Sequence, residues 1–166
     1  MPNATTHILF ALISADVIRD YIAKKRFSLF FVLTAGIAGV LPDLDVGIYW
    51  LLNIFRDVPL SMVHRLFTHT IFVPLLFLLV AFLFKAKKKV FLFFLMVSFG
   101  IFTHLLLDAT LSGMIMPVYP LSSFSIGLNL IPGGEMGRTI ILELDGVLLV
   151  GWLVHEYMKH NIRDFI

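Results

Sequence analysis

The chain has 166 residues, of which 59% are hydrophobic and only 14% charged, and its mean hydropathy is +0.95. Ordinary soluble domains carry about 25% charged residues, and a soluble fold of this length could not bury so many Phe, Leu and Val side chains. Because the chain contains no cysteine, disulfides and thiolate metal sites are excluded, and any metal must be bound by His, Asp or Glu. The composition therefore predicts an integral membrane protein. No internal repeat or domain boundary is visible, so we expect one membrane-embedded domain over residues 1–166.

Five apolar segments approach the roughly 20 residues that a helix needs to cross a bilayer core of about 30 Å. In chain order they are 5–23, 28–52, 68–84, 90–112 and 139–158. Pro74 is expected to kink the third segment without ending it. The stretch 113–138 is rich in Gly, Pro and Ser, which predicts a long loop, partly re-entrant or lying in the membrane interface. The sequence thus predicts an all-α, polytopic bundle of about five transmembrane helices.

The basic residues set the expected orientation of this bundle. Nine of the 13 Lys and Arg residues occur in 24–26, in 85–89 and after the last span, and with five spans all of them fall on one side. Cytoplasmic loops carry the excess of Lys and Arg in membrane proteins. We therefore expect a protein of the cytoplasmic membrane with its N-terminus outside and its C-terminus in the cytoplasm.

With this orientation, most of the ionisable side chains of the spans fall in the outer leaflet. They are His7, Asp43, Asp45, His64, His69, His104, Asp108, Glu143 and Asp145. Ionisable residues inside a membrane are costly and mark functional sites by default. The orientation was assigned from Lys and Arg alone, so the convergence of acids and histidines is an independent result. It predicts one shared site near the outer face of the membrane.

Two pairs of possible metal ligands have informative spacings along the sequence. His104 and Asp108 are four residues apart, so they share a helical face and can bind one metal or two adjacent ones. The side chains of Asp43 and Asp45 would point about 200° apart around the axis of a regular helix, so both can face one site only if the helix is interrupted. Pro42, directly before them, makes such a break plausible.

The other histidines differ in where they fall. His64 and His69 are five residues apart and would diverge on one helix, so we expect His64 in the preceding loop, with Thr68 close to the helix N-cap. His155 and His160 fall at the cytoplasmic end of the last span, and we assign them no catalytic role.

Each of these features can also be explained by a purely structural role, without any metal or catalysis. His7 taken alone would more often be a hydrogen-bonded residue of the membrane interface. The Asp43–Asp45 step could be a turn between two short helices, and the His104–Asp108 pair could be a structural hydrogen bond. Their joint occurrence in one leaflet favours the functional interpretation.

Four motifs follow one another along the chain: TH at 6–7, LPDLD at 41–45, HRLFTHT at 64–70 and HLLLDA at 104–109. This ordered set resembles the YdjM-type family of membrane-bound, metal-dependent hydrolases, whose members commonly carry LPDID, HRGxTHS and HxxxD. The resemblance covers about the first 120 residues. Leu66 and Thr70 replace a glycine and a serine of the family motif, and neither change removes a ligand.

The family is distantly similar to zinc-dependent phospholipase C and to P1-type nucleases. That similarity implies a metal set made of Asp43 or Asp45, His64 or His69, His104 and Asp108, with His7 and Glu143 as additional ligands. Mixed imidazole and carboxylate ligands suit Zn²⁺, with Mn²⁺ or Fe²⁺ also possible. Soluble relatives supply further histidines that are missing here on this side, so we expect one or two ions.

These observations predict a metal-dependent hydrolase acting at the outer face of the membrane. A metal-activated water would be the nucleophile, and whichever of Asp43 and Asp45 binds metal less tightly would orient or deprotonate it. Arg65 would hold a phosphate oxygen, although an arginine there can also simply pair with lipid headgroups. The depth of the site favours a phosphoester of a lipid or lipid-linked substrate, and we expect no nucleic acid partner.

Two other functions remain open at this point. A metal-ion or proton transporter would also use intramembrane His and Asp, but it needs polar residues through both leaflets, and the inner halves of spans two to four are nearly all apolar. A non-catalytic membrane protein with a structural metal would instead have a closed coordination shell.

Overall fold

The computed structural model describes residues 3–60 and 63–159. Its six α-helices are α1 (Ala4–Val17), α2 (Leu29–Ala38), α3 (Asp45–Asn53), α4 (Phe72–Leu83), α5 (Lys88–Thr110) and α6 (Gly134–Lys159). A π-helical turn, Ile18–Ile22, continues α1, and a 3₁₀-helix, Leu41–Leu44, precedes α3. Within the described ranges the extended pairing is limited to one isolated bridge between Ile115 and Ile126. The predicted all-α fold is confirmed.

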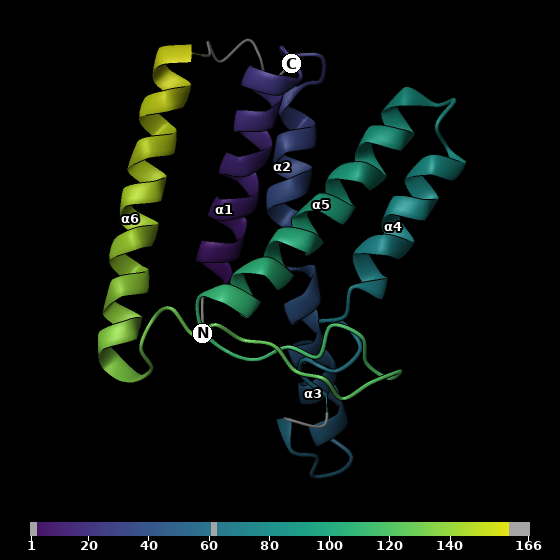
Figure 1. Ribbon diagram of the computed structural model, residues 1–166, viewed down its shortest axis with the longest axis vertical. Coiled ribbons are helices and arrows are strands. Elements are labelled where there is room, and N and C mark those ends of the chain that lie inside the picture. Colours follow the sequence, from purple (N-terminus) through teal and green to yellow (C-terminus); the bar gives the residue numbers. More distant parts are fainter. Residues whose placement is uncertain (1–2, 61–62, 160–166) are drawn as a thin grey trace.

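The long helix α5 organises the bundle. It packs against α4, α2 and α1, whereas α6 stands beside α1 (Figure 1). Gly100 of α5 meets α2 so closely that a Cβ there would overlap the carbonyl oxygen of Ala35. Close approach of helices over small residues is the usual packing mode of helices in membranes. The helix contacts therefore depend on small side chains as much as on large ones.

Gly39 marks a break in the second predicted span. Where the sequence suggests one helix over 28–52, α2 ends at Ala38 and the Leu41–Asn53 segment continues at an angle of 45°. Pro42 lies in the first turn of the 3₁₀-helix that follows the break, where its missing N–H costs nothing. The break leaves carbonyl oxygens at the end of α2 without a helical partner.

Fewer helices than expected are long and apolar enough to cross a membrane by themselves. Among the described residues α5 meets these criteria, and α2 with Leu41–Asn53 meets them as a bent pair. α4 is apolar but has only 12 residues instead of the expected 68–84. α1 passes into a π-helix after 14 residues, and carboxylates interrupt the apolar run of α6. Length and hydropathy therefore do not support five spans.

The exposed surface of the bundle is apolar, whereas much of its interior is polar. Leu79 and Phe82 on α4, Phe102 on α5 and Leu153 on α6 are among the many large apolar side chains that point outward. Histidines, aspartates and threonines are buried instead. Extended apolar surfaces of this kind mark contacts with a membrane or another apolar partner.

Candidate metal centre

Side chains from four separate segments meet at the end of the bundle where α1 begins and α5 ends (Figure 1). They are His7 on α1, Asp43 in the 3₁₀-helix, His69 before α4, and His104 and Asp108 on α5. Asn3 fixes the start of α1 because its side chain accepts the N–H of Thr6 at 2.9 Å, a typical N-cap contact. The expected convergence of the TH, PDLD, THT and HLLLD motifs is therefore seen in the structure.

Asp43, His69, His104 and Asp108 form what we call the metal cage. The Nε2 atoms of His69 and His104 are 3.1 Å apart, and Asp43 Oδ1 lies 3.5 and 3.6 Å from them. Asp108 Oδ2 lies 3.6 Å from His69 Nε2 and 3.8 Å from His104 Nε2. Ligands about 2.0–2.2 Å from a tetrahedral Zn²⁺ stand roughly 3.3–3.6 Å from one another. Each of the two carboxylates thus has the spacing to both histidines that a tetrahedral shell requires, and Asp43, His69 and His104 together bring ligand atoms within 4.8 Å of one another.

Hydrogen bonds fix the tautomers of both cage histidines. His104 Nδ1 lies 2.7 Å from the carbonyl oxygen of Gly39, which can only accept, so Nδ1 carries the proton. Thr68 Oγ1 donates its one proton to Asp45 at 2.6 Å and therefore accepts from His69 Nδ1 at 3.0 Å. In their neutral forms both rings direct an Nε2 lone pair into the cage. Outer partners that orient histidines in this way are a regular feature of metal sites.

Asp45 has a different role from Asp43. Its buried carboxylate accepts from His64 Nδ1 at 2.8 Å, from the backbone N–H of Arg65 at 3.1 Å and from Thr68. Asp45, His64 and His69 also bring ligand atoms within 4.8 Å of one another, but hydrogen-bond donors already contact both Asp45 oxygens. Asp45 therefore holds the loop that carries His69, and Asp43 faces the cage.

A second position adjoins the cage. His7 Nε2 lies 3.6 Å from Asp108 Oδ1, and the His7 ring stacks on that of His104 with centroids 3.7 Å apart. Asp108 thus directs one oxygen toward His7 and the other toward the cage. The group His7, His104 and Asp108 has ligand atoms within 4.8 Å of one another. His7 and Asp108 Oδ1 therefore lie directly beside the cage.

Arg65 lies beside the cage at the edge of a cavity. Its Nη2 donates to Asp108 Oδ2 at 2.6 Å, while its Nε is buried without a hydrogen-bond partner among the described residues. Gly113, at φ +127°, makes room for it, because a Cβ there would overlap the guanidinium. The cavity, of about 450 Å³, is lined by Leu60, His64, Arg65, Leu66, Met114 and Met116. An apolar cavity with a guanidinium and an imidazole on its wall suits an anionic group attached to an apolar molecule.

The formal charges favour a divalent cation. Asp43, Asp45 and Asp108 contribute three negative charges and Arg65 one positive charge, which leaves −2 while the imidazoles are neutral. Buried charge without compensation is strongly unfavourable. The residues present therefore fit a metal ion in both charge and geometry.

A family model described as "YdjM inner membrane protein" matches residues 1–162. The chain belongs to the YdjM inner membrane protein family. The match extends the resemblance seen in the first part of the sequence to nearly the whole chain, and the family description agrees with the predicted membrane location. Comparisons with curated proteins and with solved structures found no match.

One expected ligand of this YdjM family member lies elsewhere. Glu143 is exposed on α6 and belongs to none of the groups that could hold a metal. Asp145 is buried instead, with 6% of its surface exposed and neither oxygen hydrogen-bonded within the described residues. Asp145 shares its helical face with buried Ile141, four residues earlier. Because the burial of Ile141 is known only from the structure, the sequence alone offered no signal for preferring Asp145 over Glu143.

Sequence reasoning missed two residues that support the ligands, and it expected Thr68 near a helix N-cap, whereas α4 begins at Phe72 and Thr68 contacts Asp45 and His69. Gly39, Thr68 and Gly113 bind no metal but orient His104, His69 and Arg65. Thr68 belongs to the THT motif, and its position directly before His69 was the sequence signal for a contact with that histidine. Nothing in the sequence pointed to Gly39, because its role depends on a carbonyl that the end of α2 leaves free.

Proposed function

We propose that this protein is a membrane-embedded, metal-dependent hydrolase that cleaves a phosphoester of a lipid or lipid-linked substrate. The observation that carries the proposal is the pair of Nε2 lone pairs directed at each other over 3.1 Å between two carboxylates. Two lone pairs so close repel unless a cation lies between them. A cation there would lie beside the cavity that contains Arg65.

The chemistry can be divided among the residues of the centre. A divalent ion bound here, Zn²⁺ by preference and Mn²⁺ or Fe²⁺ as alternatives, would supply an activated water. Asp43 is the most accessible cage carboxylate, with a side chain 25% exposed against 1% for Asp108. Its Oδ1 faces the histidines, so its second oxygen is placed to orient the water and take its proton. Arg65 would hold a phosphate oxygen and the charge that develops on it.

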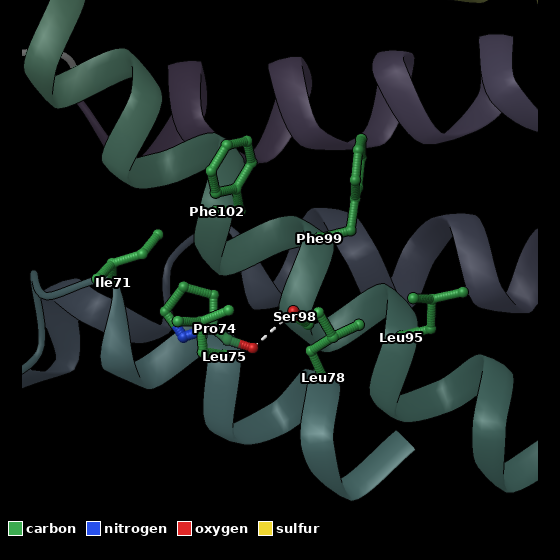
Figure 2. Close-up of a pocket in the computed structure, with 8 residues that line it drawn as sticks. All are labelled: Ile71, Pro74, Leu75, Leu78, Leu95, Ser98, Phe99 and Phe102. Atoms are coloured by element: carbon green, nitrogen blue, oxygen red, sulfur yellow. Dashed lines mark hydrogen bonds between the residues drawn. The ribbon is translucent and has the colours of Figure 1, made fainter. Parts of the chain in front are cut away.

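An apolar pocket next to the centre favours a lipid substrate (Figure 2). It lies between α4 and α5, encloses about 300 Å³ and is lined by Ile71, Pro74, Leu75, Leu78, Leu95, Ser98, Phe99 and Phe102. Its one hydroxyl, that of Ser98, is occupied by a hydrogen bond to the Pro74 carbonyl at 2.7 Å. Ile71 and Phe102 are each two residues from a cage histidine. A hydrocarbon chain in this pocket would lie along α5, the helix that also carries His104 and Asp108.

We also propose five membrane crossings, with the centre at the extracytoplasmic face. The connections that contain residues 24–26 and 85–89, and the end of α6, all lie at the end of the bundle opposite the centre (Figure 1). This placement supports the positive-inside assignment. Five units run alternately up and down the bundle, which supports five passes. They are α1 with its π-helical turn, α2 together with α3, and then α4, α5 and α6 singly.

The test begins with elemental analysis of detergent-purified protein and of the His104→Ala and Asp108→Ala variants. The parent is expected to hold at least one ion per chain, which both variants lose, and Glu143→Gln is the matched control because that acid is exposed on α6. A screen of phosphodiesters and phospholipids follows, and turnover is expected to disappear with the metal. A folded parent without stoichiometric metal, or turnover that survives in both variants, would overturn the proposal.

A further inference from the structure

A second group of acids and a histidine lies away from the metal centre, between α1 and α6. It consists of Asp16 in the last turns of α1, Asp20 in the π-helix, and His155 and Glu156 on α6, and we call it the α1–α6 cluster. Asp16, His155 and Glu156 each offer a ligand atom within 4.8 Å of the other two. His7 of the metal centre is nine residues from Asp16, about 14 Å along the helix. The two groups are therefore separate.

His155 lies near the acids of α1 and its π-helical turn at distances longer than a hydrogen bond. His155 Nε2 lies 3.7 Å from Asp16 Oδ2 and 3.4 Å from Asp20 Oδ2. Both distances exceed the roughly 2.7–3.2 Å of a good N–H···O hydrogen bond. They are close to the roughly 3.3–3.6 Å between neighbouring ligands of a tetrahedral ion. The separations resemble those of the metal cage.

Asp16 is the most deeply buried carboxylate of the cluster. It is 1% exposed, and neither of its oxygens accepts a hydrogen bond within the described part of the chain. Arg19 pairs with Asp20 at 3.0 Å and donates its Nε to the Phe27 carbonyl at 2.8 Å. A buried carboxylate placed this way needs a cation, which is either a metal ion or a proton shared with another carboxyl group.

A cavity gives an ion access to this position. It encloses about 340 Å³ between α1 and α6, and Asp16 and His155 are the ionisable groups on its wall, next to Trp152. Among the helices, α6 makes its main contact with α1. An ion held by residues of both helices would therefore fix α6 to the rest of the bundle.

We infer that Asp16, His155 and Glu156 form a second divalent-cation site, with Asp20 beside it, that clamps α6 onto α1. The carboxylate and imidazole ligands suit Zn²⁺, Mn²⁺ or Co²⁺. The inference rests on none of the residues of the metal centre and does not depend on the proposed hydrolase activity.

Trp152 provides a direct probe of this site. The chain has two tryptophans, so Trp50→Phe leaves Trp152 as the sole fluorophore of its kind. Titration of the detergent-purified full chain with Co²⁺, which quenches a nearby indole, is expected to give saturable quenching at one equivalent for this site. Asp16→Asn and His155→Ala should each weaken it by roughly tenfold or more. Glu143→Gln, an exposed acid of the same helix, should leave it unchanged.

A His104→Ala background separates the two sites. Quenching of Trp152 that persists in this background belongs to the α1–α6 cluster, whatever becomes of the metal centre. Quenching that is absent or not saturable in the Trp50→Phe parent, or that is unchanged in Asp16→Asn and His155→Ala, would overturn the inference and leave a shared proton as the cation. Gel filtration and thermal unfolding show whether each variant is folded, and His155→Gln replaces His155→Ala if that variant is not.

Discussion

His69 and His104 face each other with their Nε2 atoms 3.1 Å apart, while the Nδ1 proton of each ring is committed to another group. The acceptors are the Thr68 hydroxyl and the Gly39 carbonyl, which come from different segments of the chain. Because the lone pairs of both rings point at each other, the surrounding fold creates a position for a cation and not for a hydrogen bond between neutral rings. The predictions below test how the fold maintains this position.

Asp45→Asn is expected to weaken metal binding without abolishing it. The carboxylate organises the loop from His64 to Thr68 through three donors, and an amide would present N–H groups to some of them. Loss of such an outer partner typically costs about 10–100-fold in metal affinity. Competition with a chelator measures the affinity, and Asp57→Asn, an exposed aspartate, is the control. Unchanged affinity would mean that Asp45 does not position the ligands.

Gly113→Ala is expected to separate metal binding from turnover. A methyl group at this position would overlap the Arg65 guanidinium, and the backbone φ of +127° would also be strained by any side chain. Metal content should remain that of the parent, whereas kcat/KM on a phosphoester should fall by about 100-fold, as when a charge-stabilising donor is lost. Gly133→Ala is the matched control, because a Cβ there meets open space. Full turnover in Gly113→Ala would show that Arg65 is not needed where the structure places it.

Gly100→Ala tests the helix packing. The added methyl would overlap the backbone of Ala35 and push α5 away from α2. Overpacking of this kind costs about 1–3 kcal/mol of unfolding free energy, which thermal unfolding in detergent would detect as a lower Tm. Gly151→Ala on α6 is the control, since nothing lies within 4 Å of the added Cβ. Equal melting of both variants would contradict the close contact between α2 and α5.

Membrane orientation can be tested by cysteine labelling, because the chain has no cysteine of its own. Leu121→Cys lies in the exposed loop near the metal centre, and Ala86→Cys lies in the exposed connection between α4 and α5. A membrane-impermeant maleimide added to intact cells, with the outer membrane made permeable where one is present, should label the first and not the second. The reverse pattern would place the metal centre on the cytoplasmic side.

Several features of the site could be predicted from the sequence because they depend on order and spacing. His104 and Asp108 share a helical face at any tertiary arrangement, and the expected convergence of His7 and His69 with them is seen in the structure. The break near Pro42 was also visible in the sequence. These features predict which segments meet.

Other features depend on contacts that spacing does not encode. Asp43 and Asp45 are equivalent in the sequence, and their roles diverge because the donors of the following loop reach only Asp45. Glu143 and Asp145 likewise differ only in which side of α6 meets α1. α1 passes into a π-helix at Ile18, next to the buried side chains of Asp16 and Arg19. Such outcomes follow from tertiary packing.

Zinc K-edge X-ray absorption of the purified, metal-loaded protein tests the metal cage most directly. The account predicts nitrogen and oxygen ligands at about 2.0–2.2 Å with the outer-shell scattering of imidazole. The His69→Ala His104→Ala double variant should lose this signal, and Glu143→Gln should retain it. A folded parent that binds no ion after loading, or a spectrum that the double variant leaves unchanged, would contradict the account.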